Sequence, residues 1–279
     1  MPSSIKIDPF FGRGAHGTFL NTNSMGSFVS IVLPLFIIKY IFTNKKKYLI
    51  ASIIAFNVLI MCIARSSWVA FAVISIIGII YLIVKKNKDY WKRFLILLIG
   101  FIISFTAIYM QKGNNIVVSK INVVEVELKQ AKENGISNYM GSGRIEIWKL
   151  TSKLLYKVPM LGTGIDALEY GLAHFETEEF LNYIIKHGAY IDRAHNEYLH
   201  IAVTMGIPAV IIYIAFISWI LIPKLRQLFK DKKNATFSIV IISYLVQAFF
   251  NFSTIGVAPI FWFVLGLSEN KTFYKIDKD

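Results

Sequence analysis

The sequence predicts an all-α, multi-pass membrane protein with about seven transmembrane helices and one large, mostly helical extracytoplasmic loop. Three observations support that prediction. Hydrophobic residues make up 55% of the 279 residues, and the mean hydropathy is +0.55, which is too apolar for a soluble domain. The apolar residues come in long runs, several of them close to the roughly 20 residues that cross a bilayer as a helix. Short basic blocks follow every second run.

The apolar runs divide the chain into three parts. Residues 1–110 contain a polar lead and about four predicted spans, residues 111–197 form the outer loop, and residues 198–279 contain about three spans and a tail. We place the predicted spans over residues 24–42, 48–64, 67–84, 94–110, 198–222, 235–252 and 254–268.

The basic blocks predict how the spans are oriented. They follow the first, third, fifth and seventh runs and include Lys45, Lys46, Lys47, Lys85, Lys86, Lys224, Arg226, Lys271 and Lys275. Basic residues in short loops favour the cytoplasmic side, so the polar lead and the outer loop are expected on the other side. Ten basic and ten acidic residues balance within 111–196, so the net charge of +13 reflects topology, and we expect no binding to nucleic acid.

The outer loop is long enough to have structure of its own. We expect helices over residues 116–133, 144–157 and 166–187. The first has an apolar face of Val123, Val124, Leu128 and Ala131. Val158-Pro159 ends the second helix, and Gly162-Thr163-Gly164 then reads as a turn rather than a phosphate-binding loop.

Arginine is distributed unevenly between the two sides. The chain has 24 Lys and only six Arg, and four of the six lie on the predicted outer side: Arg13, Arg65, Arg144 and Arg193. A topology signal needs only positive charge, whereas the planar guanidinium is favoured where two oxygens of a phosphate or carboxylate are held together. From the residues alone, Arg65 in its tight turn is either an interfacial anchor or a phosphate ligand.

The polar segment closes with Arg193-Ala194-His195-Asn196-Glu197, directly before an apolar run. An imidazole there is either a locally hydrogen-bonded helix-start residue or a general base, because it titrates near neutrality. The other four histidines are expected to be structural. We expect no metal site, because the chain lacks HExxH spacing and has a single cysteine, Cys62.

Four short motifs, in this order, resemble the O-antigen ligase and polysaccharide polymerase family of membrane glycosyltransferases. They are Gly17-Thr18-Phe19-Leu20-Asn21-Thr22-Asn23, Ala64-Arg65-Ser66-Ser67-Trp68, Arg144-Ile145-Glu146-Ile147-Trp148 followed by Pro159 to Gly164, and Ala194-His195-Asn196-Glu197-Tyr198-Leu199 followed by Gly206-Ile207-Pro208. The resemblance covers most of residues 13–222. Ala64 departs from it, because the family usually has a small hydroxyl residue there.

The resemblance implies transfer of a glycan from a polyprenyl (undecaprenyl) diphosphate carrier to an acceptor glycan, at the outer leaflet of the bacterial cytoplasmic membrane. It implies that Arg65 and Arg144 bind the diphosphate and that His195 takes the proton from the acceptor hydroxyl. It further implies substrate-binding roles for Arg13, Arg193 and Asn196. No cofactor and no metal are implied, and the lipid bilayer is the expected surrounding.

Several interpretations of function stay open. A polymerase that extends a lipid-linked repeat unit leads, and a ligase that moves finished polymer to a final acceptor uses the same chemistry. The others are a non-catalytic transporter of lipid-linked sugars and a truncated, inactive remnant. Family members usually have more spans, and the resemblance begins near the middle of their plan. A missing N-terminal membrane half or a chain-length regulator is therefore an expected partner.

Overall fold

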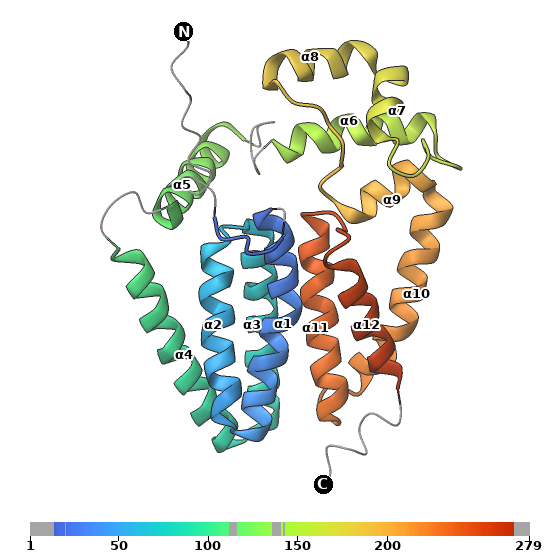
Figure 1. Ribbon diagram of the computed structural model, residues 1–279. Helices are drawn as coiled ribbons and strands as arrows, with labels where there is room; N and C mark the ends of the chain where they lie inside the picture. Colours follow the sequence, from blue (N-terminus) through green and yellow to red (C-terminus); the bar gives the residue numbers. More distant parts are fainter. Residues whose placement is uncertain (1–13, 20, 112–115, 136–140, 142, 271–279) are drawn as a thin grey trace.

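The computed structural model describes residues 14–19, 21–111, 116–135, 141 and 143–270, and within these ranges it contains twelve α-helices and no strand. Figure 1 shows two groups of helices, a bundle and a cap at one of its ends. The predicted all-α fold is confirmed for these ranges.

The bundle consists of seven helices, which correspond to the seven apolar runs. They are α1 (Thr22–Thr43), α2 (Lys46–Met61), α3 (Arg65–Lys85), α4 (Lys88–Tyr109), α10 (Ile207–Arg226), α11 (Lys232–Phe249) and α12 (Ala258–Glu269). The cap contains α5 (Ile116–Asn134), α6 (Arg144–Lys157), α7 (Leu168–Phe175), α8 (Thr177–His187) and α9 (Glu197–Met205). The α1–α2, α3–α4 and α10–α11 connections, which carry basic blocks, lie at the end away from the cap (Figure 1).

Four helices, α1, α3, α4 and α10, are long and apolar enough to cross a membrane. The helices α2 and α12 are shorter, with 16 and 12 residues, and α11 begins with two lysines. The chain is therefore a membrane protein with at least these four candidate spans among its described residues, and the number of about seven stays a prediction.

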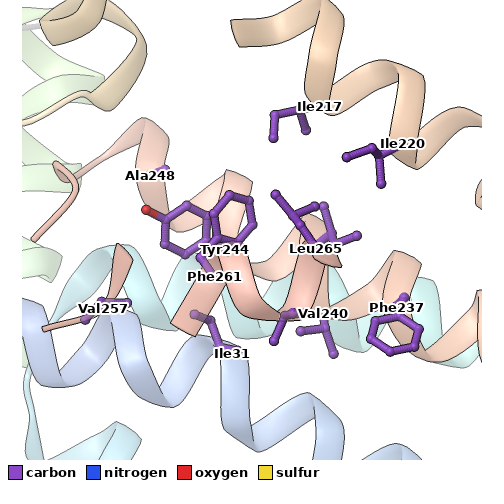
Figure 2. Close-up of a cluster of buried hydrophobic side chains, with 12 residues drawn as sticks. Ile31, Ile217, Ile220, Phe237, Val240, Tyr244, Ala248, Val257, Phe261 and Leu265 are labelled. Atoms are coloured by element: carbon purple, nitrogen blue, oxygen red, sulfur yellow. The ribbon is translucent and has the colours of Figure 1, made fainter. Parts of the chain in front are cut away.

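The largest buried cluster joins the two ends of the sequence. Ile31 of α1 packs with residues of α10, α11 and α12, as Figure 2 shows. At its centre the rings of Tyr244 and Phe261 stack with their centroids 3.8 Å apart. A separate cluster in the cap buries Leu154, Leu168 and Leu172, so α6 and α7 pack on a core of their own.

Two helices that were predicted to be continuous are each divided into two in the structure. The predicted span over 198–222 divides at Gly206 into α9 and α10. The predicted helix over 166–187 divides at Glu176, whose φ of −128° and ψ of 39° are not helical. Lys157 holds that break, because its Nζ donates to the Phe175 carbonyl at 2.6 Å and pairs with the Glu176 carboxylate at 3.0 Å.

The predicted apolar face of the helix over 116–133 packs only in part, because Val124 and Ala131 are half-buried. The side chains of Val123 and Leu128 are exposed, whereas Val117 is buried in the same cluster as α1 and α2, with Ile116 and Ile121 packed against it. The helix α5 is thus rotated so that its polar Lys120 and Glu127 face the body of the protein, and Glu127 there contacts Arg65 of α3.

Candidate functional site

Three predicted catalytic residues lie at starts of helices in or next to the cap. Arg65 is the first residue of α3, Arg144 is the first residue of α6, and His195 comes two residues before α9 begins. The α3 start is fixed against the end of α2, because Trp68 Nε1 donates to the Leu59 carbonyl at 3.0 Å. The predicted tight turn before Arg65 is confirmed, since only residues 62–64 separate the two helices.

Arg65 is paired with a carboxylate that the sequence did not suggest. Its Nη1 donates to Glu127 Oε2 at 2.7 Å, and the two side chains are only 16% and 20% exposed. The Arg65 Nε is buried and has no hydrogen-bond partner in the described ranges. The guanidinium therefore keeps a donor available beside the one that Glu127 uses.

Arg144 is a mostly buried cation, and within the described residues no hydrogen bond or ion pair reaches its guanidinium. Burial lowers the pKa of Arg144, and the neighbouring Arg65 charge lowers it further. A guanidinium stays protonated in proteins, so this is a site where positive charge is held at a cost. Such a cost is typical of an anion-binding position.

His195 lies in the same electrostatic neighbourhood. Burial lowers the pKa of His195, the Arg144 charge lowers it further, and only Asp192 opposes them. The imidazole is therefore neutral at pH 7 and able to accept a proton. Its ring meets Phe252 edge-on with centroids 5.3 Å apart, and its buried Nδ1 has no partner in the part of the chain that is described.

The backbone at His195 is left-handed, with φ of 50°. A non-glycine residue in this region is strained, and strained residues concentrate at functional sites. Asn196, the next residue, is extended, and its Oδ1 accepts from the Leu199 N–H at 3.0 Å as the N-cap of α9. The amide oxygen of Asn196 is thus used by the helix, and its side chain is buried.

Arg193 makes its contacts apart from Arg65 and Arg144. It forms an ion pair with Asp166, and its Nη1 lies 3.4 Å from His200 Nε2. Its guanidinium also lies 5.8 Å from the centre of the Phe252 ring, which His195 contacts as well. The structure thus groups Arg65, Arg144 and His195 and places Arg193 beside them with its own counter-ion, whereas Arg13 lies outside the described residues.

A family model described as O-antigen ligase matches residues 50–214, which is more than half of the chain and includes Arg65, Arg144 and His195. The chain belongs to the O-antigen ligase family. No curated protein matches it. The predicted family is confirmed, and the match contains the second, third and fourth motifs, whereas the first, over residues 17–23, lies before it. The chain is a membrane glycosyltransferase of the O-antigen ligase and polymerase type.

In this O-antigen ligase family member, sequence reasoning missed a buried acid beside His195. Glu197 is 6% exposed and accepts from Tyr213 of α10 at 2.8 Å and from Tyr244 of α11 at 2.9 Å. Burial raises the pKa of Glu197, and the two tyrosine hydroxyls work against that rise. The sequence does contain one indication of this role: Glu197 is a carboxylate at the edge of an apolar run, where a charge without a partner is costly.

The glycine turn of the O-antigen ligase motif has a structural role. The Thr163 N–H donates to the Val203 carbonyl and the Gly164 N–H to the Thr204 carbonyl, both at 2.9 Å. A Cβ added at Gly206 would lie 2.0 Å from the Met160 carbonyl oxygen. The predicted turn is confirmed, and its close backbone approach ties the segment after α6 to the α9–α10 junction.

The bundle contains an apolar cavity of about 430 Å³, whose lining on α3 lies C-terminal to Arg65. It is lined by α1, α2, α3, α4 and α11, and on α3 it begins at Phe71 and continues past Gly78. Its wall includes the stacked Phe56 and Phe101 rings, with centroids 4.3 Å apart. The cation group, by which we mean Arg65 and Arg144, therefore adjoins this cavity through α3. That helix has the Arg65 charge at its start and apolar space along its length.

Proposed function

We propose that the chain transfers a glycan from a polyprenyl diphosphate carrier to a sugar hydroxyl at the outer leaflet, as a polysaccharide polymerase. Arg65 and Arg144 hold the diphosphate, and His195 is the general base. The observation that carries the proposal is Arg144, a mostly buried cation without a described counter-ion. The Arg65 charge lowers the pKa of Arg144, and the Arg144 charge lowers the pKa of His195. The family match supports the chemical class.

The chemistry follows from these three side chains. The acceptor hydroxyl oxygen attacks the anomeric carbon, the bond from that carbon to the diphosphate oxygen breaks, and the hydroxyl proton passes to the neutral His195 imidazole. Negative charge builds on the leaving diphosphate. Cationic donors fixed in a site of low dielectric stabilise that charge more than they stabilise the substrate. Arg65 and Arg144 provide those donors from two different helices.

The same proposal includes a membrane topology for the chain. The cap lies on the outer side of the bacterial cytoplasmic membrane, the connections with basic blocks lie on the cytoplasmic side, and the seven bundle helices form the membrane part. The cavity along α3 receives part of the prenyl chain, since it is apolar and begins under the cation group.

The test uses the bacterial strain that carries this gene. The gene is deleted and replaced by the wild type, by His195→Gln or by His174→Gln, an exposed histidine of the cap that serves as the matched control. Surface and lipid-linked glycans are sized on gels, and membrane levels of each variant are checked by immunoblot. We expect His195→Gln to match the deletion and His174→Gln to match the wild type.

The glycan profile of the deletion also separates polymerase from ligase. Single repeat units left on the carrier identify a polymerase, whereas long polymer left on the carrier identifies a ligase. A normal profile with His195→Gln at normal membrane levels would refute the proposed base.

A further inference from the structure

The helix α5 brings two more charged groups to the Arg65–Arg144 group. Lys120 and Glu127 are seven residues apart, which is two helical turns, so they share one face of α5. Figure 1 shows α5 near the cap ends of α2 and α3, where Arg65 lies. Burial lowers the pKa of Lys120, Arg65 and Arg144 lower it further, and Glu127 opposes them, so all four groups interact.

One oxygen of Glu127 is held as a phosphate oxygen would be. Its Oε2 accepts from Arg65 Nη1 at 2.7 Å and from the Gly141 backbone N–H at 3.3 Å. A guanidinium together with a backbone N–H just before a helix is a common way to bind a phosphate oxygen. Gly141 comes three residues before Arg144, so the backbone donor and the second arginine approach from the same segment.

The charges in this group do not balance. Arg65, Arg144 and Lys120 are three cations, and Glu127 is the carboxylate among them. For Arg144 and Lys120 no hydrogen bond or ion pair is found within the described residues. A group with excess positive charge and one internal anion is suited to a multiply charged anion that takes the place of the carboxylate.

We infer that α5 completes the diphosphate site: Glu127 is an internal counter-ion that the diphosphate displaces from Arg65, and Lys120 is a third cation that then binds the diphosphate. This inference rests on the proposed function. It assigns to α5 two residues of opposite effect, because Glu127 competes with the ligand whereas Lys120 attracts it. The motifs that identify the family include neither residue.

The test measures binding of farnesyl diphosphate to the full-length protein in nanodiscs of uncharged lipid, by isothermal titration calorimetry. Glu127→Gln keeps the shape and one oxygen of the side chain but removes the competing charge. We expect it to bind about tenfold more tightly than the wild type, the gain expected from releasing one charge-assisted hydrogen bond. Lys120→Gln should bind about tenfold more weakly.

The same helix provides matched controls. Glu125 and Lys129 are exposed and pair with each other at 3.1 Å, so Glu125→Gln and Lys129→Gln change the same charges without touching the site. Both should bind like the wild type. Inorganic pyrophosphate, titrated in parallel, tests whether the four variants act on the phosphate group, and the same order of affinities is expected for it.

The outcomes separate this inference from the proposed function. If the wild type binds farnesyl diphosphate and Glu127→Gln binds no more tightly than Glu125→Gln, the counter-ion role is wrong and the proposed function stands. If Lys120→Gln binds as tightly as Lys129→Gln, Lys120 is no ligand of the diphosphate. If the wild type and all four variants fail to bind, the proposed function itself is refuted. Melting temperatures of each variant verify that it is folded.

Discussion

The buried acid beside the proposed base gives a sharp prediction about stability. Tyr244→Phe removes the hydroxyl that donates to Glu197 Oε2 at 2.9 Å and keeps the ring that stacks on Phe261. Glu197 is 6% exposed, so no bulk water replaces the lost donor. Hydrogen bonds to charged groups contribute about 1.5–3 kcal/mol, so we expect the free energy of unfolding to fall by about 2 kcal/mol. In a chain of this size that lowers the melting temperature by about 4–8 °C.

A second substitution on the same carboxylate makes the pH dependence testable. Adding Tyr213→Phe removes the other donor, at 2.8 Å, and leaves burial free to raise the pKa of Glu197 further. An acid whose pKa is higher in the folded state than in the unfolded state binds more protons when folded. The unfolding free energy of the double variant should therefore increase as the pH falls through that raised pKa, towards the usual value of 4.5.

The assay is thermal unfolding in detergent, followed by tryptophan fluorescence. Tyr198→Phe is the matched control, because its hydroxyl donates at the same 2.9 Å but to the neutral carbonyl of Leu245. That loss should cost only about 1 kcal/mol. If Tyr244→Phe melts no lower than Tyr198→Phe, Glu197 carries no charge that the tyrosines stabilise, and the reasoning fails.

Three further predictions follow from the site. Asp192→Asn removes the charge that raises the pKa of His195, so the acid limb of the pH–rate profile should move to lower pH; a limb that moves up would contradict the assignment of His195 as base. Gly78→Phe fills the apolar cavity and should slow transfer from a long-chain carrier by about tenfold, since misplacing a substrate by about 1 Å suffices for that. Gly266→Phe, which also meets open space but lies outside the cavity lining, is its control, and equal rates would rule out the cavity. Gly206→Ala combines a φ of 92° with a backbone clash and should cost at least about 2 kcal/mol, measured as a lower melting temperature; an unchanged one would mean that the facing loop moves freely.

The helices were predictable where apolar periodicity and local stop signals act alone. The helix over 144–157 has the predicted bounds, because Gly143 precedes it and Val158-Pro159 ends it. The break at Gly206 was not predicted, because apolar residues continue on both sides of it. Its cause is a tertiary contact, the backbone of the segment after α6 pressed against Gly206. Composition does not predict such a close approach, although Gly206-Ile207-Pro208 is a local indication that a helix ends there.

The candidate site likewise contains residues that the sequence could predict and residues that it could not. The uneven use of arginine drew attention to four outer-side residues, Arg65 and Arg144 among them, and the position of His195 before an apolar run drew attention to its imidazole. The family resemblance then gave Arg65, Arg144 and His195 their expected roles. Lys120 and Glu127 were missed, because their importance depends on the rotation of α5. The sequence favoured a buried face with Val123 and Leu128, whereas packing buries Val117 instead and turns the charged pair inward.

The local arrangement around His195 explains why its neighbours have structural roles. A left-handed non-glycine residue costs roughly 1–2 kcal/mol, so surrounding contacts must hold it. Asn196 starts α9 with its side chain, and Glu197 fixes that start to α10 and α11 through Tyr213 and Tyr244. The two residues that follow the imidazole, Asn196 and Glu197, therefore help to set its position. This also accounts for the predicted sensitivity to Tyr244→Phe, because weakening the Glu197 anchor loosens the turn that keeps the neutral imidazole next to Arg144.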